Sequence, residues 1–191
     1  MKLAIFGGTF DPIHDAHLAI ARAAADRFRL DRVLFVPAAH PPHKRGATYA
    51  SYEDRVRMAE LACAADPRFE VSRLEQDTAR SYSIETIEKV RATLAPGDEL
   101  YFLIGADAFA EIRSWYRWQD VARSVQFIVV SRPGVSYEVS EGARAERLDD
   151  LELGISSSDI RRTFAEGGSP DGLPAAVLAY AAARNLYRPT A

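Results

Sequence analysis

The chain has 191 residues, one cysteine and a formal net charge of −3. This length suggests a single domain, residues 1–191, that folds without a disulfide or a structural metal. The charge argues against a nucleic-acid partner, because proteins that bind nucleic acid nonspecifically carry a strong basic excess. The apolar run after Lys2 is too short for a signal peptide and no later run is long enough to span a membrane, so we expect a cytoplasmic protein without a membrane partner.

Strands and helices are expected to alternate in the first half of the chain. Apolar patterning predicts strands over Lys2–Phe6, Arg32–Pro37 and Phe69–Ser72. Helices are expected over His14–Phe28, Ser51–Ala65 and Tyr82–Leu94. Ser51 with Asp54 resembles a capping box at the start of the second helix.

The second half continues the same alternation. Strands are expected over Leu100–Ile104 and Val125–Val130, with two short helices between them and a further strand near Leu148–Leu153. Helices over Ser156–Glu166 and Pro174–Asn185 then form a small C-terminal helical part. This order predicts an α/β fold, a Rossmann-like doubly wound sheet that is mostly parallel and has helices on both faces.

The stretch GGTFDPIHDAH lies between the first predicted strand and the first predicted helix. Ligands of such sheets bind beyond the carboxyl ends of the strands, which is where this stretch is placed. Gly7 and Gly8 let the backbone approach a bulky group, and the helix start offers free N–H groups and a positive dipole end. His14 and His17 share one face of the first turn. Together they indicate a phosphate site, and the alternative is a tight turn followed by two exposed histidines.

A second set of polar residues precedes the predicted helix at Ser156. Ser156, Ser157 and Ser158 are placed to hold phosphate oxygens, with Arg161 one turn further as a charged clamp. An ordinary serine N-cap fits the same residues equally well.

Other polar and aromatic side chains have two interpretations each. His40 and His43, together with His14 and His17, form two H-x-x-H pairs that suggest a zinc site. The absence of a suitably spaced carboxylate or cysteine favours instead a basic loop in which Lys44 meets a phosphate, or a plain surface loop. The aromatic cluster Trp115, Tyr116 and Trp118 is core or a stacking platform, and Trp118 is assigned to the core.

The motifs together resemble a known family. GGTFDPIHDAH and ISSSDIR are similar to the HxGH and ISSTxIR boxes of the nucleotidylyltransferase superfamily. PAAHPPHK, SYSIET, GADAF followed by SWYRW, and SRPG resemble bacterial nicotinate-nucleotide adenylyltransferases. Two departures are Ala16, where the family usually has glycine, and Ser158, where it has threonine.

The resemblance implies site residues and substrates. His14 and His17 are the implied catalytic residues. The implied ATP-binding residues are Gly7, Gly8, Thr9, Phe10, His14, His17, Ile155, Ser156, Ser157 and Arg161. The implied nicotinate mononucleotide-binding residues are Lys44, Ser83, Thr86, Asp107, Trp115, Tyr116 and Arg132. Trp115 is expected to stack on the pyridine ring, the backbone N–H groups of Ser83 and Tyr116 to meet its carboxylate, and Asp107 to bind sugar hydroxyls.

The implied reaction transfers the adenylyl group of ATP to nicotinate mononucleotide, with Mg²⁺ arriving on ATP and no metal site on the protein. The alternatives are a sister enzyme acting on nicotinamide mononucleotide or phosphopantetheine, a nucleotide-binding regulator without turnover, and a zinc-dependent hydrolase. The sequence leaves the oligomeric state open, and a homo-oligomer is one of the options.

Overall fold

A computed structural model describes residues 1–40, 48–131, 137–140, 142–149 and 154–189. Within these residues one six-stranded sheet has the order β3-β2-β1-β4-β5-β6. Every neighbouring pair of strands is parallel. The strands are β1 (Lys2–Gly8), β2 (Arg32–Pro37), β3 (Phe69–Val71), β4 (Glu99–Gly105), β5 (Gln126–Val130) and β6 (Arg144–Leu148). This strand order is that of the doubly wound dinucleotide-binding folds, so the predicted fold class is confirmed.

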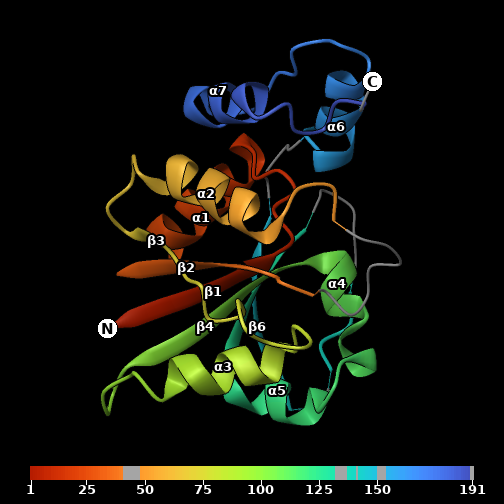
Figure 1. The fold of residues 1–191 in the computed structure, drawn as a ribbon. Coiled ribbons are helices and arrows are strands. Elements are labelled where there is room, and N and C mark those ends of the chain that lie inside the picture. Colours follow the sequence, from red (N-terminus) through yellow and green to blue (C-terminus); the bar gives the residue numbers. More distant parts are fainter. Residues whose placement is uncertain (41–47, 132–136, 141, 150–153, 190–191) are drawn as a thin grey trace.

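Helices cover both faces of the sheet (Figure 1). On one face lie α1 (Asp15–Phe28) and α2 (Tyr52–Cys63), and on the other lie α3 (Ser83–Arg91) and α5 (Trp118–Ser124). A short helix α4 (Ala106–Ala110) and a 3₁₀ turn, Ile112–Ser114, connect β4 to α5. The C-terminal helices α6 (Ser157–Ala165) and α7 (Ala175–Ala183) lie beyond α1 and α2.

The first strand shows why its sequence is continuously apolar. Ala4 and Phe6 point into the core that α1 and α2 cover. Leu3 and Ile5 point into the core on the α3 and α5 side. A parallel strand that is buried on both faces needs an unbroken apolar run rather than an alternating one.

The last strand begins earlier than the sequence predicts. The structure places β6 at Arg144–Leu148, whereas the pattern suggested a strand near Leu148–Leu153, of which residues 150–153 lie outside the described part. Among the described residues β6 pairs only with β5, and Arg144, Glu146 and Arg147 on it are exposed. Charged residues suit an edge strand, and they remove the apolar periodicity that would reveal it.

The predicted N-caps agree with the structure. The Ser51 hydroxyl accepts a hydrogen bond of 3.1 Å from the backbone N–H of Asp54 at the start of α2. Ser156 does the same for Asp159 at the start of α6, at 3.2 Å. In the described part of the chain, no helix has the length and apolar character to cross a membrane.

Candidate active site

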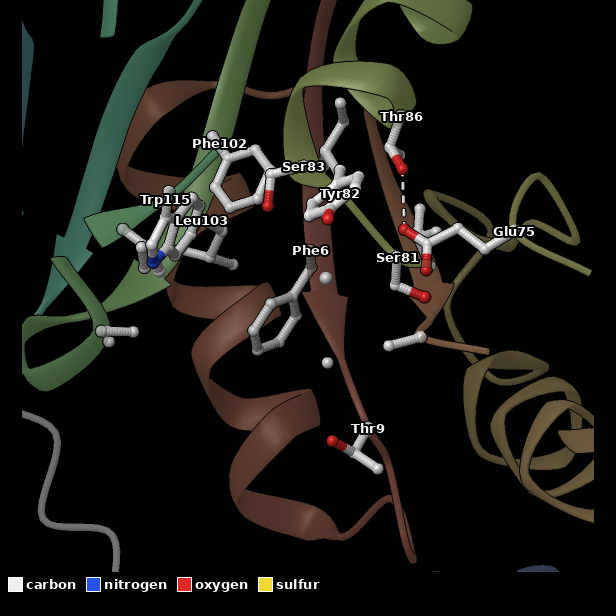
Figure 2. A pocket seen from close by; sticks show the side chains of 18 of the residues that line it. Phe6, Thr9, Glu75, Ser81, Tyr82, Ser83, Thr86, Phe102, Leu103 and Trp115 are labelled. Carbon is white, nitrogen blue, oxygen red and sulfur yellow. Dashed lines mark hydrogen bonds between the residues drawn. The ribbon is translucent and has the colours of Figure 1, made fainter. Parts of the chain in front are cut away.

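A pocket of about 320 Å³ opens at the carboxyl ends of β1 and β4. These strands are neighbours in the middle of the sheet, where the chain leaves toward opposite faces, so the pocket lies at the topological switch point. Figure 2 shows Trp115 on one side of the pocket and Glu75 with Thr86 on the other. The wall between them comes from β1, β4 and the start of α3, and includes Gly7, Gly8, Thr9, Ser81, Tyr82, Ser83, Leu103 and Gly105.

The two glycines at the end of β1 differ in how much space a side chain would have. A Cβ on Gly8 would lie 2.9 Å from the ring of Phe10, which folds back over the strand end with a φ of 48°. A Cβ on Gly7 would meet only the Phe102 ring at 3.8 Å, an ordinary contact. Packing against Phe10 therefore disfavours any side chain at position 8, whereas packing within the described protein leaves room for a Cβ at position 7.

The two histidines of the first box stand together at the start of α1. His14 is the N-cap residue, and the ring centroids of His14 and His17 are 3.7 Å apart. The backbone N–H of His14 donates to Nδ1 of His17 at 3.2 Å. Because Nδ1 accepts this bond, the proton of a neutral His17 is on Nε2, which is then a donor.

Both imidazoles are uncharged at neutral pH. Burial lowers the pKa of His14 to about 4. Burial and, after it, the neighbouring His14 lower the pKa of His17 to about 3. His14 is only 6% exposed, and its Nδ1 is buried with no partner among the described residues. The pair is therefore a set of neutral donors rather than a standing positive charge.

The N-terminus of α1 is less open than the sequence suggests. The backbone N–H of Asp15 donates to the carbonyl of Gly172 at 2.9 Å, and the N–H of His17 turns back to the carbonyl of His14. The expectation of freely available N–H groups is thus wrong for Asp15. A C-terminal loop far away in sequence occupies that donor, and no local pattern announces it. Ala16, in the same turn, is buried.

The second box meets the first. The Ser157 hydroxyl donates to the carbonyl of Pro12 at 3.0 Å, across 145 residues of sequence. Arg161 donates to the carbonyl of Asp11 at 2.7 Å and to Oγ of Ser158 at 3.1 Å. Ile155 packs against Gly172, because a Cβ added to Gly172 would lie 2.7 Å from Cδ1 of Ile155. The structure therefore brings the two boxes into one site, with Ser156 acting as an N-cap.

The aromatic and α3 residues gather in the pocket as the sequence suggested. Ser83, Thr86, Trp115 and Tyr116 all line it. The Trp115 ring meets Phe102 edge-on with centroids 6.1 Å apart. Trp118 does not belong to the core, because it is partly exposed at the first position of α5 with the Arg113 guanidinium 6.0 Å from its ring.

Of three other predicted ligand residues, the structure describes only Asp107. Asp107 is exposed on α4 and does not line the pocket, although its neighbours Gly105 and Ala108 do. Lys44 and Arg132 lie outside the described residues, as does His43. Within the described residues no group of three or more histidine, cysteine or acidic side chains comes together as a metal site.

Sequence reasoning missed buried charged residues, among them Glu75 and Arg55. Glu75 is 6% exposed in the pocket wall, and its Oε1 accepts the Thr86 hydroxyl proton at 2.7 Å (Figure 2). Arg55 is fully buried and donates to the carbonyls of Thr9 and Ala38 at 2.7 and 2.8 Å, which joins the ends of β1 and β2. Charge on a helix face or in a polar loop normally predicts exposure, so neither residue gives a local signal.

Known proteins share both the sequence and the fold. The cytidylyltransferase-like family model matches residues 5–163. A relative from Solibacter usitatus, named "Probable nicotinate-nucleotide adenylyltransferase", is 73% identical over 187 residues, which cover 98% of this chain and 100% of the relative. A Thermus thermophilus relative with the same name is 44% identical over 190 residues, with the same coverage. This chain belongs to the nicotinate-nucleotide adenylyltransferase family. It is a nucleotidyltransferase.

Solved structures of low sequence identity share the fold. Plasmodium falciparum nicotinic acid mononucleotide adenylyltransferase complexed with NaAD has a TM-score of 0.80 and 19% identity, covering 97% of both chains. The same Plasmodium enzyme complexed with APC has a TM-score of 0.77. The Rossmann-like architecture of this chain is therefore that of other adenylyltransferases.

Proposed function

We propose that the protein transfers the adenylyl group of ATP to nicotinate mononucleotide, forming nicotinate adenine dinucleotide and pyrophosphate in NAD biosynthesis. The observation that carries this proposal is the meeting of the two boxes beside the pocket at the switch point. Membership of the nicotinate-nucleotide adenylyltransferase family supports it. The whole chain, residues 1–191, acts as one domain in this proposal. Its cytoplasmic location stays a prediction, and a homo-oligomer stays one of the options.

On the α1 and α6 side we propose the triphosphate site. It comprises Gly7, Gly8, Thr9, Phe10, His14, His17, Ile155, Ser156, Ser157 and Arg161. The Nε2–H of His17 is a neutral donor for a phosphate oxygen, because its Nδ1 already accepts from the backbone of His14. His14 and His17 are the catalytic residues in this proposal, since they stabilise charge that develops at the α-phosphate.

On the α3 side we propose the mononucleotide site. Trp115 offers a flat face for the pyridine ring, and the backbone N–H groups of Ser83 and Tyr116 meet its carboxylate. The Thr86 hydroxyl donates its hydrogen bond to Oε1 of Glu75, so it offers a ligand only lone pairs. Asp107, Lys44 and Arg132 stay predicted contacts to sugar and phosphate.

The proposed chemistry needs no general base. The phosphate of the mononucleotide has a second pKa of about 6 and is largely dianionic at neutral pH. One of its oxygens attacks the α-phosphorus of ATP, and the bond from that phosphorus to the bridging oxygen of the β-phosphate breaks, so pyrophosphate leaves. The protein therefore works by aligning two anions and by stabilising charge along the line of attack.

Mg²⁺ enters the proposal with ATP. Phosphate oxygens and water are its expected ligands, and the bound ion neutralises phosphate charge. The residues of this chain hold the phosphates rather than the ion.

An acceptor screen tests the function. Purified protein is mixed with ATP and, separately, nicotinate mononucleotide, nicotinamide mononucleotide and phosphopantetheine, and pyrophosphate release is measured. We expect release that is fastest with nicotinate mononucleotide. Fastest release with another acceptor indicates a sister enzyme, and ATP binding without release indicates a regulator. Stoichiometric zinc in the purified protein would favour the hydrolase.

A further inference from the structure

Asp11 of the first box is a buried carboxylate with three donors. It is 2% exposed. Its Oδ1 accepts from the hydroxyl of Tyr187 at 2.9 Å and from the N–H of Ala50 at 3.1 Å, and its Oδ2 accepts from the N–H of Tyr49 at 2.8 Å. A buried carboxylate is stable only when its oxygens are satisfied, so these donors fix its orientation.

Three distant parts of the chain meet at this residue. The carbonyl of Asp11 accepts from Arg161 of α6, and that of the adjacent Pro12 accepts from Ser157. Tyr49 and Ala50 lie directly before Ser51, the N-cap residue of α2. Asp11 thus couples the first box to the second box and to the Tyr49–Ala50 backbone before α2.

Tyr187 reaches Asp11 from the C-terminal end of the described chain, 176 residues away. Its ring stacks on Phe164 of α6, with centroids 5.8 Å apart. Burial, with a further contribution from Asp11, raises the pKa of its hydroxyl, so the hydroxyl keeps its proton and donates. Tyr187 lines a surface hollow with Tyr49 and Arg161 and does not line the substrate pocket.

We propose that Tyr187 is a positioning residue for adenylyl transfer, whose hydroxyl holds the Asp11 carboxylate so that the first box and the Tyr49–Ala50 backbone keep their relative geometry. This inference rests on the proposed function. Without the hydroxyl, Oδ1 of Asp11 keeps one donor in a buried site, and the carboxylate turns to recover a partner. The loop that leads to His14 then shifts, and an in-line reaction is sensitive to such a shift.

The chain offers a matched control in Tyr180 of α7. Its hydroxyl also donates to a buried carboxylate, Oδ1 of Asp54, at 2.9 Å. Asp54 lies in α2 rather than in the first box, and Arg184 pairs with it at 2.7 Å. Tyr180→Phe therefore removes the same chemical group from the same helical part without touching Asp11.

The experiment compares Tyr187→Phe, Tyr180→Phe and the wild type. We measure kcat, the KM values for ATP and nicotinate mononucleotide, Tm, and amide hydrogen exchange at Tyr49 and Ala50. In Tyr187→Phe we expect kcat to fall about tenfold with little change in either KM, since misalignment weakens the transition state more than binding. Exchange at both amides should accelerate. Tyr180→Phe should keep the wild-type kcat and exchange rates even where its Tm falls.

Two results would overturn the inference. One is a wild-type kcat, or unchanged exchange at Tyr49 and Ala50, in Tyr187→Phe. The other is an equal loss of kcat in Tyr180→Phe, which would show general destabilisation. A wild-type protein that releases no pyrophosphate with any acceptor would overturn the proposed function, and with it the catalytic part of this inference.

Discussion

At the scale of single residues, His17 owes its chemistry to one backbone hydrogen bond. The bond from the His14 N–H to Nδ1 fixes both the ring orientation and the tautomer. The lowered pKa values of both histidines mean that, in the proposed triphosphate site, they meet ATP as neutral donors. A phosphate placed against them stabilises their protonated forms, so ligand binding itself raises their pKa values.

Replacement of His17 tests its catalytic role. His17→Ala should lower kcat by roughly 10²–10³, the typical cost of one lost transition-state donor. His17→Asn is the matched variant, because its amide oxygen can accept from the His14 N–H while no group replaces the Nε2 donor. We expect the same loss of kcat in both, with Tm closer to wild type in the asparagine variant. Near-normal kcat in either one would remove His17 from the reaction.

The proposed mononucleotide site also makes substrate choice depend on single groups. In that proposal a ring carboxylate accepts from both backbone N–H groups, of Ser83 and Tyr116, whereas a carboxamide offers one oxygen. An unpaired buried donor costs about 1–3 kcal/mol, so kcat/KM should favour the acid over the amide roughly tenfold or more. Values for nicotinate and nicotinamide mononucleotide, measured side by side, check this. Equal values or a preference for the amide would move the ring site elsewhere.

Trp115→Ala separates stacking from that preference. Loss of the flat face should raise the KM of both mononucleotides, because the ring of each stacks in the same way. The ratio of the two kcat/KM values should stay unchanged, because the groups that distinguish acid from amide are the backbone N–H groups of Ser83 and Tyr116. A ratio that collapses would contradict this division of roles.

At the scale of elements, α6 joins the second box to the first through Arg161. The Arg161 guanidinium donates two hydrogen bonds within the protein, one to the Asp11 carbonyl and one to the Ser158 hydroxyl. Its guanidinium carbon lies 4.4 Å from the centre of the Tyr49 ring. The start of α6 is therefore held rigidly against the loop before α1, which preorganises the proposed triphosphate site.

Arg161→Ala should raise the KM for ATP more than that for the mononucleotide, because the proposed triphosphate site loses a charge and the contact between the boxes. Steady-state kinetics with each substrate varied in turn measure this. Arg162→Ala is the control, since Arg162 is exposed and its ion pair is with Asp159 of the same helix. A rise confined to the mononucleotide KM would assign Arg161 to the other substrate.

At the scale of the whole molecule, the buried histidines link stability to pH. Their pKa values in the folded protein, about 4 and about 3, lie below the unfolded value of 6.5. The unfolded chain therefore binds more protons between these values, so stability falls as pH falls through this window. The carboxyls of Asp54 and Asp66 have pKa values below their usual 3.8. Their contribution to the free energy of unfolding is therefore lost only as the pH falls below this usual value.

Urea unfolding measures this dependence. Between pH 7 and pH 5 we expect the free energy of unfolding to drop by on the order of 1–2 kcal/mol per histidine. A variant carrying both His14→Gln and His17→Asn should show a clearly shallower drop over the same range. An unchanged slope in that variant would mean that these two histidines are not buried neutral groups in solution.

Local patterns were enough for most elements. The apolar run before Gly7 predicted a strand because each of its residues packs on one face of the sheet or the other. Ser51 and Ser156 predicted helix starts because a cap depends only on residues three apart. The edge strand β6 was misplaced because Arg144, Glu146 and Arg147 face water and carry no apolar period.

The sequence by itself determined the fold class, the family and many of the groups that gather at the switch point, among them Ser83, Thr86, Trp115 and Tyr116. Only the tertiary structure decided which hydrogen-bond partners the buried polar groups have. Tyr187 donates to Asp11, the Asp15 N–H donates to the Gly172 carbonyl, and Glu75 accepts a hydrogen bond from the Thr86 hydroxyl. Strand and helix patterns depend on neighbours a few residues away, so they can be read along the chain. The partner of a buried polar atom depends on how whole elements pack, and it is fixed only when the chain has folded.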